Sequence, residues 1–278
     1  MTFSQTILRG LLAFIATCIV QVIAGMLVPM KPIALPHFLL WVVLSTAVSV
    51  AALSGVAARS EWRGWRLGTA VAAFPLLVTS VNFIEGVVFL TNSQVQWARV
   101  FLYTVISAIL SIPVWMLLFG GPKRTSSDHY PMIRSKSRGE RAWKFVLSDV
   151  SYVFLYFLAG TIIFPYVKDF YATQHLPSTG QLVALQLLVR GPVFILMVLG
   201  LARMLGLPRV SGALAVAAVF TLLTGVVPLL MPNPYFPDSV RWVHMCEVTS
   251  SNFVFSAFVA WLWGRPEPAR EVALRHAA

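Results

Sequence analysis

The sequence predicts an all-α fold: a polytopic transmembrane helical bundle of about eight spans, arranged as a 4+4 parallel internal repeat. Three observations support this prediction. Of the 278 residues, 58% are hydrophobic and only 11% are charged, whereas a soluble domain has roughly 25% charged residues. The apolar residues form runs of about 20 residues, each long enough to cross a hydrocarbon core of about 30 Å. Short motifs also recur between the two halves of the chain.

The predicted spans follow one another with short polar or proline-containing segments between them. They cover residues 7–28, 38–58, 67–91, 99–119, 145–167, 180–202, 210–231 and 240–263. Pro, Gly and charged residues concentrate in the connections, which is expected because irregular backbone is unsuited to lipid. We interpret the first apolar run as a membrane span, because it is too long for the apolar core of a signal peptide.

Positive charge is distributed unequally between the two ends of these spans. If the N-terminus is inside, 16 of the 21 Lys and Arg residues lie on the same side as the N-terminus, and Arg190 lies within a span. The four on the opposite side are Lys31, Arg99, Lys168 and Arg241. This split follows the positive-inside rule and predicts an integral membrane protein with both termini in the cytoplasm. Topology therefore explains the net charge of +11, and we expect no nucleic-acid partner.

The two halves of the chain resemble each other. The predicted organisation is a four-helix half (1–120), a basic cytoplasmic linker (121–144), a second four-helix half (145–264) and a cytoplasmic tail (265–278). "GVAARS" (55–60) matches "GLARML" (200–205), and "FG" (119–120) matches "WG" (263–264), at offsets of 145 and 144 residues. "IAGMLVPM" (23–30) matches "LAGTIIFPYV" (158–167) at an offset of 135. Parallel duplications of this kind occur in transporters, although generic Ala-Leu-Val-Gly membrane composition is an alternative explanation.

Few ionisable residues fall within the predicted spans, where each costs about 2.5–3.5 kcal/mol on insertion scales. Glu85 lies near the outer end of span 3, and Glu247 lies at a similar depth in span 8. His244 is one helical turn from Glu247, so both are expected to face a cavity or a partner helix. The predicted substrate- or ion-binding residues are Asn82, Glu85, Arg190, His244, Glu247, Ser251 and Asn252.

The chemistry of this cluster leaves several roles open. His244, Glu247 and Glu85 could bind a divalent metal such as zinc, manganese or iron. The same groups could exchange protons, or hold an ion, a small solute or a lipid headgroup in the outer leaflet. They could also form an interhelical hydrogen-bonded clamp without any ligand.

Other polar residues have local interpretations. Arg190 precedes Gly191 and Pro192, which are expected to kink span 6, and it could neutralise Glu85 or Glu247 or extend toward lipid headgroups. Asp149 is expected in the first turns of span 5, where a helix N-terminus favours an anion. The proline-rich segment 231–239 could form a lid above His244, with polar contacts from Asn233 and Tyr235, or a plain turn.

One stretch carries a family resemblance. "PNPYFPDSVRWVHMCEVTSSNFVF" (232–255) resembles the C-terminal signature of an uncharacterised bacterial family of multi-pass integral membrane proteins. "NFIEG" (82–86) is similar to a short Glu motif in the third span of that family. The resemblance implies a multi-pass protein of the bacterial cytoplasmic (inner) membrane but no activity.

Motifs of known enzymes give no better assignment. The sequence contains no His-Glu-x-x-His, no nucleotide-binding loop and no Gly-x-Ser-x-Gly. The predicted function is therefore a transporter or permease for an unidentified small solute or ion. The alternatives are a membrane-embedded metal-dependent enzyme of hydrolase type, and a structural or accessory membrane subunit that binds no ligand.

Overall fold

The computed structural model describes residues 2–29, 38–89, 97–121, 137–174, 177–231 and 236–264. Within these ranges every regular element is helical. Eight helical segments of the described chain are long and apolar enough to cross a membrane, which confirms the predicted class and number of spans.

The helices follow the predicted spans closely. The first five are α1 (Phe3–Leu27), α2 (Phe38–Arg59), α3 (Gly64–Phe89), α4 (Trp97–Phe119) and α5 (Arg138–Tyr171). The sixth span is α6 (Thr179–Leu185), η1 (Gln186–Arg190) and α7 (Gly191–Leu205). The seventh is α8 (Arg209–Thr221), η2 (Leu222–Val226) and α9 (Val227–Leu230), and the eighth is α10 (Asp238–Trp263).

Helix α5 is longer than its apolar run. It begins at Arg138, after Ser137 accepts a hydrogen bond from the Glu140 amide as an N-cap. Glu140 and Lys144 then form an ion pair of 2.8 Å along the helix, which supports a polar first stretch. Residues 138–144, expected in the linker, are therefore helical. Asp149 lies about three turns into α5, so the expectation that it stabilises the helix N-terminus is wrong.

Two spans contain a π-helical turn, and each turn ends two residues before a proline. η1 precedes Pro192 and η2 precedes Pro228. Proline has no amide hydrogen, and its ring collides with the carbonyl four residues earlier, which is Leu188 in η1 and Thr224 in η2. A wider π turn relieves this collision, and such turns recur at functional sites. Span 6 therefore carries the predicted kink.

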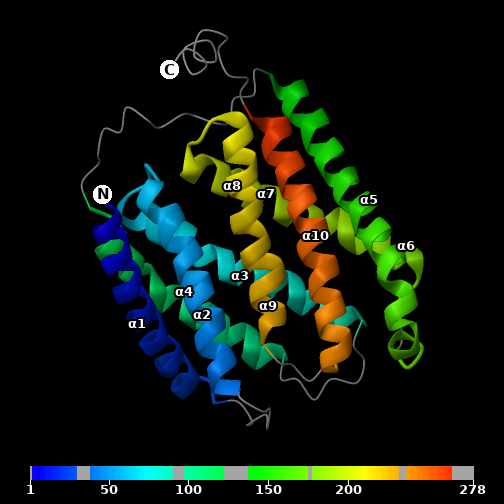
Figure 1. The fold of residues 1–278 in the computed structure, drawn as a ribbon, viewed down its shortest axis with the longest axis horizontal. Coiled ribbons are helices and arrows are strands. Elements are labelled where there is room, and N and C mark those ends of the chain that lie inside the picture. The colour runs from blue at the N-terminus through cyan, green and yellow to red at the C-terminus, as the bar shows by residue number, and fades with distance from the viewer. Residues whose placement is uncertain are drawn as a thin grey trace.

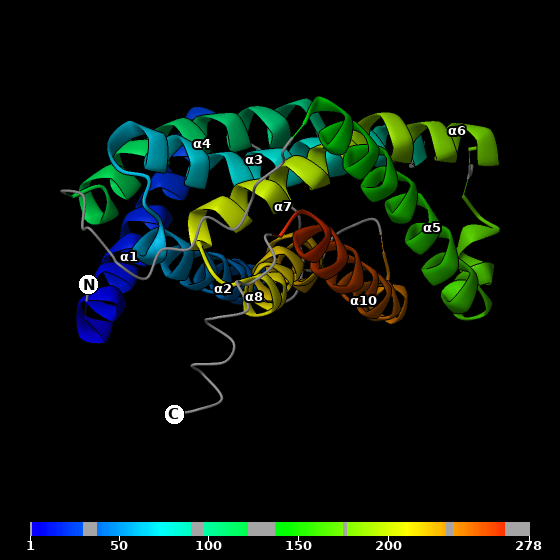
Figure 2. The same ribbon diagram turned by 90° about the horizontal axis from the view of Figure 1, so that it is seen from above.

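The eight spans form a bundle with α1 and α5 at opposite edges (Figures 1 and 2). α10 lies between α8 and α5 and contacts both. α7 is the most enclosed element, and its Phe194, Ile195 and Leu201 belong to the apolar core. α5, by contrast, exposes large apolar side chains such as Phe154 and Ile162, as a lipid-facing helix should.

Some predictions remain untested by this structure. The 4+4 repeat is not shown by the arrangement of the helices and stays a prediction. The same holds for the orientation of the chain in a membrane. The linker residues 122–136 and the tail residues 265–278 lie outside the described residues.

Candidate functional site

A cavity of about 620 Å³ lies between α3, α5, α10 and the sixth and seventh spans. It is found toward the end of the bundle where α3 and α5 end and α10 begins; Figure 1 shows these helix ends. All seven residues predicted from the sequence line this cavity, namely Asn82, Glu85, Arg190, His244, Glu247, Ser251 and Asn252. Residues from spans 3, 6 and 8 thus meet as expected from their depth.

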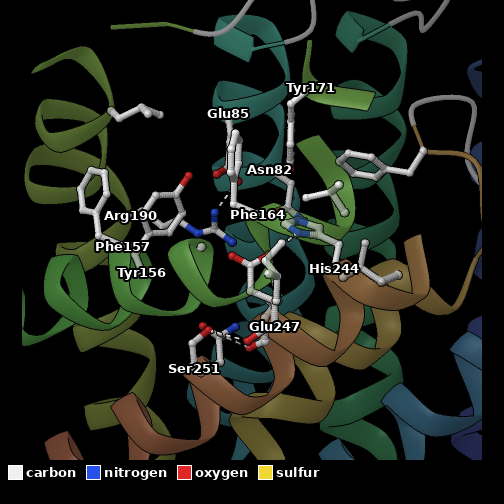
Figure 3. A pocket seen from close by; sticks show the side chains of 18 of the residues that line it. Asn82, Glu85, Tyr156, Phe157, Phe164, Tyr171, Arg190, His244, Glu247 and Ser251 are labelled. Atoms are coloured by element: carbon white, nitrogen blue, oxygen red, sulfur yellow. Dashed lines mark hydrogen bonds and ion pairs between the residues drawn. The ribbon is translucent and has the colours of Figure 1, made fainter. Parts of the chain in front are cut away.

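The first feature of the cavity is an ion pair between Arg190 of η1 and Glu85 of α3 (Figure 3). The Arg190 side chain is 8% exposed and that of Glu85 is 24% exposed, so the pair is largely shielded. The guanidinium also lies over the ring of Phe194, 5.2 Å from its centroid. The structure confirms Arg190 as a counter-ion and identifies Glu85 as its partner.

The second feature is a hydrogen bond between His244 and Glu247 on α10. His244 Nδ1 lies 2.6 Å from Glu247 Oε2, and the Glu247 side chain is 9% exposed. Because Nδ1 is engaged, Nε2 is the histidine nitrogen left to interact with a ligand. The ring of Phe236 stacks near the imidazole, with centroids 5.2 Å apart.

Residues 231–239, the segment before α10, were expected to form either a lid over His244 or a plain turn. Phe236, in the described part of this segment, lines the cavity and contacts the ring of His244. Asn233 and Tyr235, the predicted polar contacts, lie outside the described residues.

A buried hydrogen-bond chain supports one wall of the cavity. Asn252 Nδ2 donates to Thr224 Oγ1 over 2.9 Å, and Thr224 Oγ1 donates to the Phe220 carbonyl over 2.7 Å. Thr224 belongs to the π turn η2, so this chain connects the seventh span to α10. The Ser251 hydroxyl donates to the Glu247 carbonyl over 2.9 Å, which leaves only its lone pairs for a ligand.

Helix α5 supplies an aromatic wall that sequence reasoning did not assign to the site. Tyr152, Tyr156, Phe157, Phe164 and Tyr171 line the cavity. Figure 3 shows Tyr156, Phe157, Phe164 and Tyr171 around the two acid–base pairs. The signal in the sequence was the spacing of these aromatics, with Tyr152 and Tyr156 four residues apart and Phe157, Phe164 and Tyr171 seven residues apart, which places them along one side of a helix.

The geometry gives no support to a metal centre. In the described ranges, no group of three or more His, Cys, Asp or Glu side chains is placed to hold a metal ion. Glu85, proposed as a third ligand, pairs with Arg190, while His244 and Glu247 bind each other.

Comparison with known proteins adds no assignment. No protein-family model, no curated protein and no solved structure matches this chain. The resemblance carried by residues 232–255 therefore stays a prediction.

The cavity combines apolar walls with a few convergent polar groups, which is the usual composition of a small-molecule site. Its volume of about 620 Å³ falls within the range of roughly 300–1,000 Å³ typical for drug-sized ligands. Two carboxylates, a guanidinium and an imidazole can hold a polar group, while the aromatic wall can contact an apolar body.

Proposed function

We propose that the protein is a transporter or permease of the bacterial inner membrane and that this cavity binds its solute. The observation that carries the proposal is the presence of two acid–base pairs, Glu85–Arg190 and His244–Glu247, in one cavity of a membrane helix bundle. Ionisable groups inside spans are costly and commonly mark substrate or ion pathways. Transporter sites also lie at broken helices, and Arg190 belongs to the π turn that interrupts span 6.

The charges and aromatics of the cavity favour a particular class of solute. The carboxylates of Glu85 and Glu247 outnumber the Arg190 guanidinium, and His244 balances them only when it is protonated. Aromatic faces attract cations, and Tyr156 and the other α5 aromatics line the same space. We therefore propose an organic solute with an apolar body and a positively charged or neutral polar group.

The distribution of charge supports the proposed orientation. Arg59, Arg63, Arg138 and Arg209 lie at the end of the bundle where α2 ends and α3, α5 and α8 begin. The cavity is found toward the opposite end, where Lys168 is one of the few basic residues. Under the positive-inside rule, the solute site lies in the outer half of the membrane.

Equivalent contacts at the two halves support the proposed 4+4 repeat. At the start of the first span, Arg9 donates to the Leu118 carbonyl of α4 over 2.7 Å. At the start of the fifth, Lys144 lies 6.0 Å from the ring centroid of Trp263 in α10. Arg9 and Lys144 are 135 residues apart, the same offset as the "IAGMLVPM" match.

A second pair of contacts supports the same repeat. The Gly64 amide donates to the Gly120 carbonyl over 3.4 Å, so the start of span 3 meets the end of span 4. Arg209 Nε donates to the Trp261 carbonyl over 2.8 Å, so the start of span 7 meets the end of span 8. Gly64 and Arg209 are 145 residues apart, which matches the offset of the "GVAARS" motif.

The test is binding of a matched pair of organic ions to the purified protein in lipid nanodiscs. Tetraphenylphosphonium and tetraphenylborate have the same shape and opposite charge, and empty nanodiscs correct for partition into lipid. We expect saturable binding of the cation and not of the anion. Glu247→Gln should weaken binding of the cation about tenfold. The reason is that the attraction between the cation and the Glu247 carboxylate, roughly 1–2 kcal/mol, is lost.

Asp169→Asn is the matched control, since Asp169 is an exposed acid of α5 at the same end of the bundle. Uptake of the cation into vesicles then separates transport from binding alone. If Glu247→Gln and Glu85→Gln leave binding and uptake unchanged and only lower the melting temperature, the cavity groups are structural and the proposal is wrong.

A further inference from the structure

A second polar cluster lies buried beside the π turn η1. It consists of Asp149 on α5 and Gln186 at the start of η1, neither of which lines the cavity. Asp149 is 9% exposed and Gln186 is 0% exposed. Asp149 Oδ1 and both polar atoms of the Gln186 side chain are buried without a hydrogen-bond partner in the described chain. Unpaired buried polar groups are rare in folded proteins and call for an explanation.

Gly191 brings the Asp149 carboxylate against the backbone of span 6. A Cβ atom at position 191 would lie 1.9 Å from Asp149 Oδ1 and 3.0 Å from the Gln186 carbonyl oxygen. Only glycine leaves room for the carboxylate there. The Gln186 carbonyl accepts the Gly191 amide across the π turn, so one of its two lone pairs remains free. The Asp149 carboxylate oxygen and the Gln186 carbonyl oxygen thus both lie beside Gly191.

Asp149 has no described cation to neutralise it. The nearest charged and titratable groups lie on α5 itself and on the elements packed against it. They are Lys144 and Tyr152 of α5, Arg190 of η1, and His244 and Glu247 of α10. In α7, the one charged residue is Arg203, near the far end of that helix. Lys144 pairs with Glu140, Arg190 with Glu85, and His244 with Glu247. Tyr152 is uncharged when protonated and cannot compensate a carboxylate.

An unpaired ionised carboxylate inside a membrane bundle carries a large desolvation cost. A small cation at the carboxylate removes that cost. Carboxylate and helix-break carbonyl oxygens are the groups that bind Na⁺ or H⁺ in transporters with interrupted helices.

We propose that Asp149 and Gln186 form a buried binding site for a small monovalent cation, either Na⁺ or a proton. The Asp149 carboxylate, the Gln186 carbonyl and the Gln186 side-chain oxygen are the ligands. A proton would bind the carboxylate itself, and Na⁺ would be shared among these oxygens. Gln186 and Arg190 are one turn apart in η1, so occupation of this site is positioned to act on the Arg190–Glu85 pair. The site stands on its own geometry and does not require the cavity to bind a solute.

The test is the thermal stability of the protein in lipid nanodiscs, measured in two arms. The first arm compares sodium chloride with choline chloride at equal ionic strength and fixed pH. The second arm uses choline chloride alone over a series of pH values. A ligand that binds only the folded state raises the melting temperature, by roughly 5 °C at saturation for a chain of this size. We expect this shift in at least one arm, and the arm identifies the cation.

Asp149→Asn keeps the shape of the side chain and removes its charge, so it should fold and lose the response. Gly191→Ala should also lose the response, because its methyl group occupies the space of Asp149 Oδ1. Gly200→Ala on the same helix is the matched control, since its nearest neighbour is Phe74 Cζ at 3.8 Å. The proposal is overturned if the wild-type protein responds in neither arm, or if Asp149→Asn responds as the wild type does. Neither result bears on tetraphenylphosphonium binding in the cavity.

Discussion

Replacing Arg190 by Met tests the ion pair on which the cavity is built. The substitution keeps an apolar stem against Phe194 and removes the charge that faces Glu85. Glu85 is then left as a lone carboxylate inside a membrane bundle. We expect a clear loss of stability, and we expect Glu85→Gln to recover most of it in the double variant, because a buried pair replaced as a unit leaves no uncompensated charge.

The magnitude follows from the position of Glu85. A lone acid at the bilayer centre costs about 3 kcal/mol on insertion scales. The Glu85 side chain is 24% exposed, and the residue lies one turn before the end of α3, so water and the interface reduce this cost. We expect a loss of about 2 kcal/mol, which corresponds to a fall in melting temperature of roughly 4–8 °C.

The assay is a double-mutant cycle followed by thermal unfolding of the four proteins in the same nanodiscs. Asp169→Asn is the control, because Asp169 is an exposed acid of α5 and its replacement should change the stability by at most about 0.5 kcal/mol. If the effects of Arg190→Met and Glu85→Gln simply add, the two side chains do not interact in the folded protein and the reasoning about the cavity fails.

Three further changes test the packing and the topology. Gly68→Ala should lower the free energy of unfolding by about 1–3 kcal/mol, because the added Cβ would lie 2.7 Å from the Ile112 carbonyl oxygen. Gly25→Ala is the control and should be neutral, since no atom lies within 4 Å of the added Cβ. Asn252→Ala should lower the free energy of unfolding by about 1–2 kcal/mol, because the buried Thr224 hydroxyl loses its hydrogen-bond donor. An unchanged melting temperature would show that this hydrogen bond does not stabilise the site. A green fluorescent protein fused to the C-terminus should fluoresce and a fused alkaline phosphatase should be inactive, and the reverse result would invert the proposed orientation.

The number and the positions of the spans were predictable from sequence because the bilayer fixes the length of an apolar run. The depth of each ionisable residue within its span was predictable for the same reason. Glu85, His244 and Glu247 lie at similar depths, and all three line one cavity. The contact between His244 and Glu247 follows from helical spacing alone, since residues three apart share a face. Local geometry and bilayer thickness thus account for much of the site.

The remaining features depend on tertiary packing. Arg190 and Glu85 are 105 residues apart, and nothing local favoured Glu85 over Glu247 as the partner. The aromatic wall required knowledge of which side of α5 faces the bundle. The start of α5 at Arg138 was missed because its first turns are polar and are stabilised by the Ser137 cap instead of by lipid. In the sequence, only the prolines that follow the two π turns indicated where they would form.

The proposed repeat pairs each site residue of the second half with a position in the first half. At offsets of 145 and 144 residues, Arg190 corresponds to Ser45 in span 2, and Glu247 corresponds to Tyr103 in span 4. His244 likewise corresponds to Val100, so the first half lacks the acid–base groups of the second. Under the proposed repeat, the two halves would share a backbone plan but not these side chains, so they could not hold two equivalent sites. Under the proposed repeat, the acid–base groups of the cavity therefore come from the second half, and the first half contributes Glu85, which pairs with Arg190 across the halves.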